Sequence, residues 1–111
     1  MKIRIRKTDT VAILDLDGRL TFGDGQETLT AEVQNLIDSG MTRVAINLSG
    51  ITYLDSSGIG ALVRSFTALK RTGGKCTFFA PTKDVLMLLR MVRLDSVLDL
   101  VADEATALAR I

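Results

Sequence analysis

One segment constrains this chain more than any other feature of its sequence. It is a short apolar run, followed by a loop of hydroxyl-bearing residues and glycine that leads into an amphipathic helix. Residues Val44–Leu48 are mostly β-branched or apolar, which predicts a buried strand. From Ile59 onward, apolar residues recur at helical spacing. Asp55, Ser56 and Ser57 therefore lie at the start of the predicted helix.

A helix start of this kind suits a phosphorylated side chain. The N–H groups of the first helical turn have no partner inside the helix, and the aligned peptide dipoles leave partial positive charge at that end. A phosphate on a serine there would find donors that already face it. Asp55, Ser56 and Ser57 are also strong N-cap residues, so the local sequence alone leaves ordinary helix capping as the simpler interpretation.

The rest of the sequence alternates predicted strands with predicted helices. Asp24, followed by Glu27, resembles a capping box at the start of the first helix. The alternation predicts an α/β fold, in which a single mostly parallel or mixed sheet of about five strands, with an N-terminal edge hairpin, packs against about four helices. In chain order, the predicted elements are strands 2–6 and 11–16 joined by a turn at 8–10, a loop at 17–25, a helix that ends at Gly40, strand 42–48, loop 49–56, helix 57–72, strand 75–80, a helix from Thr82 to Met91, strand 97–101 and a short helix that begins at Asp103.

Length and composition are typical of a small soluble protein. With 111 residues, of which 47% are hydrophobic and 24% charged, we expect one globular domain over residues 1–111. The formal net charge of +1 gives no electrostatic reason to expect binding to nucleic acid or to an anionic membrane.

Cys76 is the only cysteine, which excludes an intrachain disulfide and a multi-cysteine metal site and favours a reducing compartment. The N-terminus is unlike a signal peptide and no apolar stretch is long enough to span a membrane, so we expect a cytoplasmic protein.

Histidine is absent from the chain, and its absence narrows the chemistry that is available. It removes Ser-His-Asp catalysis, histidine phosphotransfer and nearly all transition-metal sites. Leu54 stands where a hydrolase nucleophile elbow would need glycine, and Val63 replaces the third glycine of a dinucleotide-binding fingerprint. A receiver domain, with Asp15 and Asp17 holding a metal and Asp55 accepting phosphate, fails because the last predicted strand offers no lysine. We therefore expect neither an enzyme nor a bound metal, cofactor or small-molecule substrate.

The signature region is similar to that of a known family. The run LSGITYLDSSGIGAL at residues 48–62 resembles the signature of the STAS domain family, and in particular of the bacterial anti-sigma factor antagonists. The resemblance extends over most of the chain, through Gly18, the Gly73-Gly74 pair and the ending RLDSVLDLVADEATAL at residues 93–108. It implies a STAS-like fold. In that family the first serine after the aspartate is phosphorylated by a partner kinase, which implies that Ser56 is the acceptor here.

The resemblance also implies a function. The unphosphorylated protein would bind an anti-sigma factor that is also a serine kinase, and would thereby release a sigma factor. Phosphorylation of Ser56 would end that binding, and a serine phosphatase would restore it. STAS domains also serve as stressosome scaffolds and as adaptors in lipid-transport complexes, so a scaffold or adaptor subunit without a phospho-switch is the alternative. A weak homodimer is left open.

The expected partner-binding residues surround Ser56. Asp55 either orients the Ser56 hydroxyl or the kinase, or it simply caps the helix, and for Ser57 a structural cap is favoured over a second acceptor. Thr21 occupies a position where family members commonly carry an acidic residue, with Asp24 nearby as its substitute. The full set of expected partner-binding residues is Thr21, Asp24, Asp55, Ser56, Ser57, Gly58, Ile59 and Gly60.

Three further features of the sequence have alternative interpretations. Gly58 and Gly60 either allow a partner to approach closely or allow close packing of the helix. Arg93 stands where family members often have glycine, and a left-handed conformation there would cost arginine on the order of 1 kcal/mol. The apolar surface of the helix at 82–91 extends beyond its core stripe to Leu86, Met87 and Met91, for which filling core gaps is favoured over contact with a partner.

Overall fold

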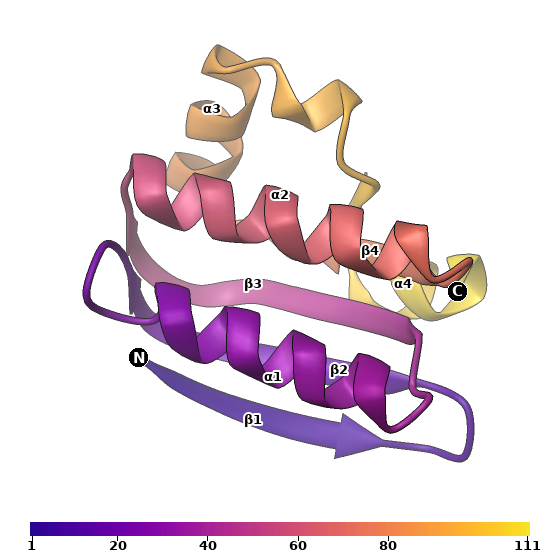
Figure 1. The fold of residues 1–111 in the computed structure, drawn as a ribbon. Coiled ribbons are helices and arrows are strands. Elements are labelled where there is room, and N and C mark those ends of the chain that lie inside the picture. The colour runs from indigo at the N-terminus through magenta and orange to yellow at the C-terminus, as the bar shows by residue number, and fades with distance from the viewer.

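The computed structural model describes all 111 residues, which form one mixed sheet covered by helices on both faces. The strand order is β1-β2-β3-β4-β5, with β1 antiparallel to β2 and all other neighbours parallel. Figure 1 shows α1 and α2 lying side by side across one face of the sheet. The predicted α/β class, with its N-terminal edge hairpin, is confirmed. The elements are β1 Lys2–Lys7, β2 Ala12–Leu20, α1 Gln26–Asp38, β3 Arg43–Leu54, α2 Ser56–Arg71, β4 Lys75–Phe79, α3 Lys83–Met91, a 3-10 turn η1 Leu94–Ser96, β5 Leu100–Val101 and α4 Glu104–Arg110.

Alternation along the strands divides the hydrophobic core between the two faces of the sheet. Leu14 and Ile46 point into the larger core, which also contains side chains of α1, α2 and α3. Their neighbours Ile13 and Ala45 point the other way and form a smaller core with Ala107 of α4. None of the helices combines the length and the apolar character needed to cross a bilayer.

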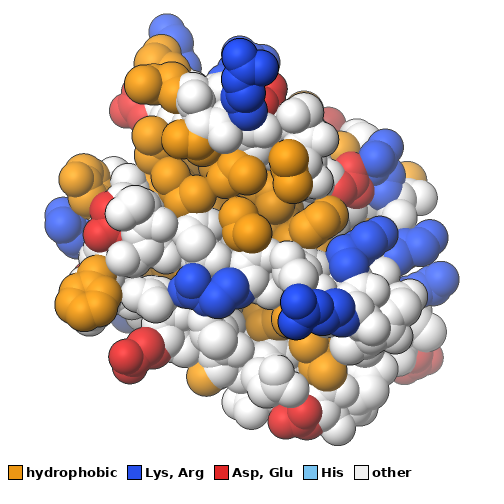
Figure 2. Space-filling view, turned by 45° about the horizontal axis from the view of Figure 1, so that its top comes forward, with side chains coloured by type: hydrophobic (Ala, Val, Ile, Leu, Met, Phe, Trp, Pro, Cys, Tyr) orange, Lys and Arg blue, Asp and Glu red, His pale blue; other side chains and the backbone are white.

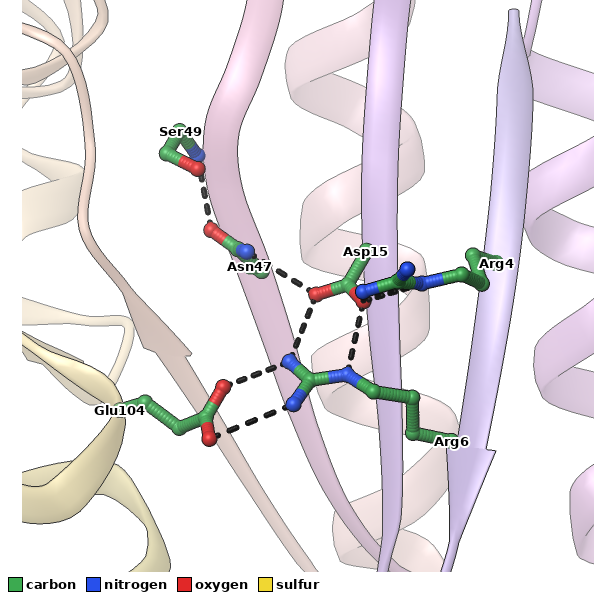
Figure 3. A network of polar contacts seen from close by, with 6 residues as sticks. All are labelled: Arg4, Arg6, Asp15, Asn47, Ser49 and Glu104. Atoms are coloured by element: carbon green, nitrogen blue, oxygen red, sulfur yellow. Dashed lines mark hydrogen bonds and ion pairs between the residues drawn. The ribbon is translucent and has the colours of Figure 1, made fainter.

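A polar network joins α4 to the β1–β2–β3 part of the sheet (Figure 3). Arg6 donates two hydrogen bonds to the Asp15 carboxylate, at 2.8 and 2.9 Å, and also pairs with Glu104 of α4. The side-chain amide of Asn47 donates to Asp15 at 2.9 Å, and Arg4 pairs with the same carboxylate at 3.2 Å. Burial by itself would raise the pKa of Asp15, but the hydrogen bonds from Arg6 and Asn47 outweigh it, so the pKa lies below its ordinary value. Asp15 is therefore occupied in a structural contact between β1, β2 and β3.

Strands β2 and β3 are longer than the sequence predicts, and both predicted loops, 17–25 and 49–56, are partly strand. β2 continues to Leu20 and β3 continues to Leu54, and these two residues are paired. β3 reaches that point through an irregularity near Gly50, where an added β-carbon would overlap the carbonyl oxygen of Leu16. In a sequence, glycine usually indicates a loop, and this is why the sequence predicts one here. In the structure, Gly50 instead permits close backbone contact within the sheet. The pairing brings the carboxyl ends of both strands to the same place.

The last predicted strand, 97–101, is mostly irregular. Leu98 is buried in the larger core, and η1 precedes it, so only Leu100 and Val101 pair with β4. The apolar character of this segment therefore reflects burial of individual side chains more than strand pairing.

Arg93 lies immediately after α3 in a left-handed conformation, with φ 61° and ψ 25°. A β-carbon is unfavourable in this conformation, so Arg93→Gly relieves strain, but glycine also has greater freedom in the unfolded chain, which offsets part of the gain. We therefore expect Arg93→Gly to raise the free energy of unfolding by about 0.5–1 kcal/mol. Urea denaturation would measure the change. Arg90→Gly, inside α3, is the matched control and should lower stability by a similar amount. Equal losses for both substitutions would contradict the assignment of strain to residue 93.

Candidate functional site

Asp55 joins the start of α2 to the loop that follows β2. It is the N-cap of α2, and its Oδ1 accepts a hydrogen bond from the Gly58 N–H at 2.8 Å. Its Oδ2 accepts from the Phe22 N–H at 3.1 Å, so both carboxylate oxygens are in use. The capping interpretation of Asp55 is thus realised, and the same side chain also ties together two loops that are far apart in sequence.

Ser56 is the first residue of α2, and its side chain is exposed. No side chain of the protein forms a hydrogen bond with its hydroxyl, and the two hydrogen bonds described for the Asp55 carboxylate come from backbone N–H groups. Ser57 is half-buried and makes no capping hydrogen bond, so the expectation that it caps the helix is wrong; Asp55 does so instead. Of the two serines, Ser56 is the more exposed.

The two glycines of the helix start have different surroundings. Gly58 is buried, and a β-carbon there would overlap the carbonyl oxygen of Leu20 and lie 2.7 Å from a methyl carbon of Leu54. A β-carbon at Gly60 would meet only the end of the Arg64 side chain, at 3.0 Å. Gly58 therefore allows α2 to pack against the end of β2, whereas nothing inside the protein requires glycine at position 60.

The loop at residues 21–25 lies beside the helix start because Asp55 holds it there. Thr21 is only 7% exposed and exchanges two backbone hydrogen bonds with Asp24, at 2.7 and 3.0 Å. Asp24 accepts a hydrogen bond from the N-terminal amine of Met1. The predicted capping box of Asp24 and Glu27 is wrong, because α1 begins after Gly25, whose φ of 91° suits glycine and which has no side chain to cap the helix.

Phe22 is a surface residue of this loop that sequence reasoning missed. The residue is 80% exposed, yet its backbone N–H is held by Asp55. A large aromatic side chain that is exposed on a loop with an anchored backbone is a common element of protein contact surfaces. The available signal was an aromatic residue in a glycine-rich segment otherwise predicted to be a polar loop.

A shallow apolar groove of about 490 Å³ lies beside the helix start, between the end of β3 and α3. Ile51, Tyr53 and Leu54 line one side, and Leu88 and Met91 line the other. On its outer side, the Tyr53 ring lies 4.8 Å from the guanidinium of Arg19 on β2. The groove, the Phe22 ring and the Ser56 hydroxyl thus belong to one end of the molecule, where the paired strands β2 and β3 stop.

The hydrogen bond from the Gly58 N–H, supported by that from Phe22, lowers the pKa of Asp55 below its ordinary value. A depressed carboxyl pKa contributes stability at pH values above the unfolded pKa, about 3.9, and this contribution disappears as the pH falls through the folded pKa. We expect Asp55→Asn, which keeps an acceptor but loses the charge, to have a lower melting temperature than the wild type at pH 7, with the difference disappearing in acid. Thermal denaturation as a function of pH tests this, and a difference that is the same from pH 7 to pH 2 would contradict it.

Comparison with known proteins supports the same reading of the fold. The model of the STAS domain family matches residues 2–107. Among solved structures, a Thermotoga maritima protein provisionally described as an anti-sigma factor antagonist superposes with a TM-score of 0.89 at 18% identity, covering 98% of this chain and 93% of its own. An anti-sigma factor antagonist from Mycobacterium paratuberculosis gives 0.87 at 16%, covering 99% and 92%. The Bacillus cell fate determinant SpoIIAA, solved in its phosphorylated form, gives 0.75 at 20%, covering 98% of both chains.

These likenesses to solved structures concern the fold, because the identities are low. The family match covers nearly the whole chain and includes the signature segment from Leu48 to Leu62. The chain therefore belongs to the STAS domain family.

Proposed function

We propose that this protein is an anti-sigma factor antagonist whose unphosphorylated form binds an anti-sigma factor with serine kinase activity and releases a sigma factor. The observation that carries the proposal is Ser56, an exposed serine at the first position of α2 whose preceding aspartate is already engaged as the cap. A structural neighbour that has been solved in a phosphorylated form supports it. The chain is then a cytoplasmic kinase substrate and not an enzyme.

Phosphorylation at Ser56 is compatible with the fold. A phosphate adds about −1.5 to −2 charges, which turns the formal net charge of +1 into roughly −1. The positive end of α2 offsets part of the repulsion between the phosphate and Asp55. Because the Ser56 side chain is exposed, the phosphate needs no space inside the protein.

The partner surface that we propose is centred on Ser56 and on the adjoining first turn of α2. Ile59 and Gly60 are half-exposed, and only the flexible end of the Arg64 side chain lies where a partner backbone would approach Gly60. Thr21 and Asp24 contribute by shaping the loop that presents Phe22, since Thr21 itself is buried. A serine phosphatase that restores the binding form would need access to the same surface.

The test is a pull-down from lysate of the native host, with wild-type protein, Ser56→Ala and Ser56→Asp as baits and with the bound proteins identified by mass spectrometry. Capture of a serine kinase by the wild type and Ser56→Ala, but not by Ser56→Asp, is the expected result. The matched control is Ser57→Ala, which should behave as the wild type. Phosphopeptide mapping of the same protein isolated from its host should place the phosphate on Ser56. Equal capture of scaffold or transporter subunits by all baits would replace the proposal with the adaptor function.

Phe22 offers a separate test of the surface. We expect Phe22→Ser to weaken binding to the captured kinase by about tenfold or more, because exposed aromatic rings in contact surfaces commonly contribute more than 1 kcal/mol. The stability should change by less than about 0.5 kcal/mol, since the ring contacts little of the protein. Isothermal titration calorimetry and urea denaturation measure the two effects. Unchanged affinity would remove this loop from the proposed surface.

A further inference from the structure

Positive charge is concentrated in one part of this nearly neutral chain. Between Ser56 and Arg93 the sequence contains seven basic residues and one acidic residue, Asp84, although the formal net charge of the whole chain is +1. All seven basic side chains are exposed, and none takes part in an ion pair within the protein. They are Arg64, Lys70, Arg71, Lys75, Lys83, Arg90 and Arg93.

The same segment carries an exposed apolar surface. On α2, Ile59, Val63 and Phe66 are only partly buried. On α3, Met87 and Met91 are 53% and 75% exposed. Figure 2 shows hydrophobic side chains gathered in one continuous area on this side of the molecule, with Lys and Arg side chains along its border. We call this surface the α2–α3 face and define it by Ile59, Val63, Phe66, Met87, Leu88 and Met91.

The phosphorylation site proposed above lies on the same line of α2 as the apolar residues. Positions 56, 59, 63 and 66 follow one another at intervals of three or four residues, so they share one side of the helix. Ser56 is therefore the first member of the row formed by Ile59, Val63 and Phe66. The groove between β3 and α3, which Leu88 and Met91 line, is also lined by Leu54, two residues before Ser56.

We propose that the α2–α3 face is a docking surface for an acidic amphipathic helix of a protein partner. An apolar stripe on such a helix would cover the exposed methionine side chains and the partly buried side chains of α2, while its acidic residues would meet the unpaired lysines and arginines at the border. Methionine side chains adapt readily to a helix of this kind. This proposal deepens the proposed function by specifying the chemistry of the partner. Only one part of it rests on that function: a phosphate on Ser56, in the same row as the apolar residues of α2, would repel the acidic helix.

The shape of the surface favours a protein helix over an anionic membrane. The apolar residues of α2 are partly buried, and those of α3 line a hollow of about 490 Å³. A concave apolar surface can hold a row of side chains from a helix, whereas insertion into lipid requires apolar side chains that protrude beyond the polar ones. The test therefore has to distinguish binding of lipid from binding of a protein helix.

The test uses the purified full chain and three probes. The first is a fluorescein-labelled peptide with leucine at helical spacing and glutamate on its other face, the second has lysine in place of each glutamate, and the third is a vesicle of phosphatidylglycerol. We expect the acidic peptide to bind, to bind less tightly as salt is added, and to bind at least about tenfold more tightly than the basic peptide. Fluorescence anisotropy measures the peptides, and cosedimentation measures the vesicles.

Two sets of variants locate the surface. Arg64→Glu combined with Arg71→Glu changes only exposed side chains, and we expect it to weaken binding of the acidic peptide about tenfold or more. Met91→Glu should have a similar effect through the apolar part of the surface. The matched control, Lys2→Glu combined with Lys7→Glu, makes the same change of charge on exposed positions of β1 and should leave binding almost unchanged. Circular dichroism confirms that each variant is folded.

Three results would overturn the proposed docking surface: equal binding of the acidic and basic peptides, an equal effect of the β1 control, or binding of vesicles without binding of the acidic peptide.

Ser56→Glu separates this proposal from the phospho-switch. If the peptide binds the wild type but Ser56→Glu binds it equally well, the docking surface stands and its link to the switch fails. If the peptide does not bind while the kinase still phosphorylates Ser56, the docking surface fails and the proposed function stands.

Discussion

Gly58→Ala is expected to lower the free energy of unfolding by about 3 kcal/mol or more, a large part of the stability of a domain of this size. The added methyl group would overlap the carbonyl oxygen of Leu20 and crowd Leu54, and these are paired backbone positions at the ends of β2 and β3. Relief would require α2 to move away from the sheet, which would also break the hydrogen bond between the Gly58 N–H and Asp55. Urea denaturation monitored by circular dichroism measures the loss.

Gly60→Ala is the matched control for this prediction. It lies in the same helix, but its β-carbon would meet only the mobile end of the Arg64 side chain. Because alanine favours helix more than glycine does, this substitution should leave stability unchanged or raise it by up to about 1 kcal/mol. If both substitutions destabilise the protein equally, the close approach of α2 to β2 does not explain the need for glycine at position 58.

Ser56→Asp is expected to weaken binding to the proposed kinase partner by about 2 to 5 kcal/mol, because an unpaired charge would be buried in the contact. That corresponds to a loss of affinity of about 30-fold to several thousandfold. The melting temperature should hardly change, since the side chain at position 56 is exposed and lies at the positive end of α2. Isothermal titration calorimetry and differential scanning calorimetry measure the two quantities.

The control for Ser56→Asp is Ser56→Ala, which removes the hydroxyl without adding charge and should retain binding. The two variants together distinguish a regulatory serine from a structural one. If the melting temperature of both variants falls by several degrees, Ser56 supports the helix start, which would contradict the proposal. Loss of binding in Ser56→Ala alone would point instead to a hydrogen bond from the hydroxyl to the partner.

The sequence predicts most of the fold because periodicity and capping residues act locally. Helices α3 and α4 begin where the sequence predicts, with Thr82 and Asp103 as their N-caps, and the run at Val44–Leu48 is a buried strand. The extension of β2 and β3 was not predictable, because glycine has the same local signal whether it opens a loop or permits close packing of strands. The same reason hides the role of Gly58, which depends on a carbonyl group of another strand.

The candidate site was predictable only in part. The position of Ser56 at a helix start follows from the local pattern, and its identification as an acceptor follows from the family resemblance. The contact between Asp55 and the Phe22 backbone is not in the sequence pattern, because it spans 33 positions along the chain. The exposure of Phe22 becomes visible only once the chain is folded.

The pairing of Leu20 with Leu54 has a consequence for the time at which the site comes into being. Contacts between distant parts of a chain form later than local ones, because the intervening segment must first be closed into a loop. The helix start at Ser56 takes its shape from such contacts, through Leu20, Asp55 and Phe22. An incompletely folded chain therefore does not display this surface, and a partner that recognises it distinguishes finished molecules from newly made or damaged ones.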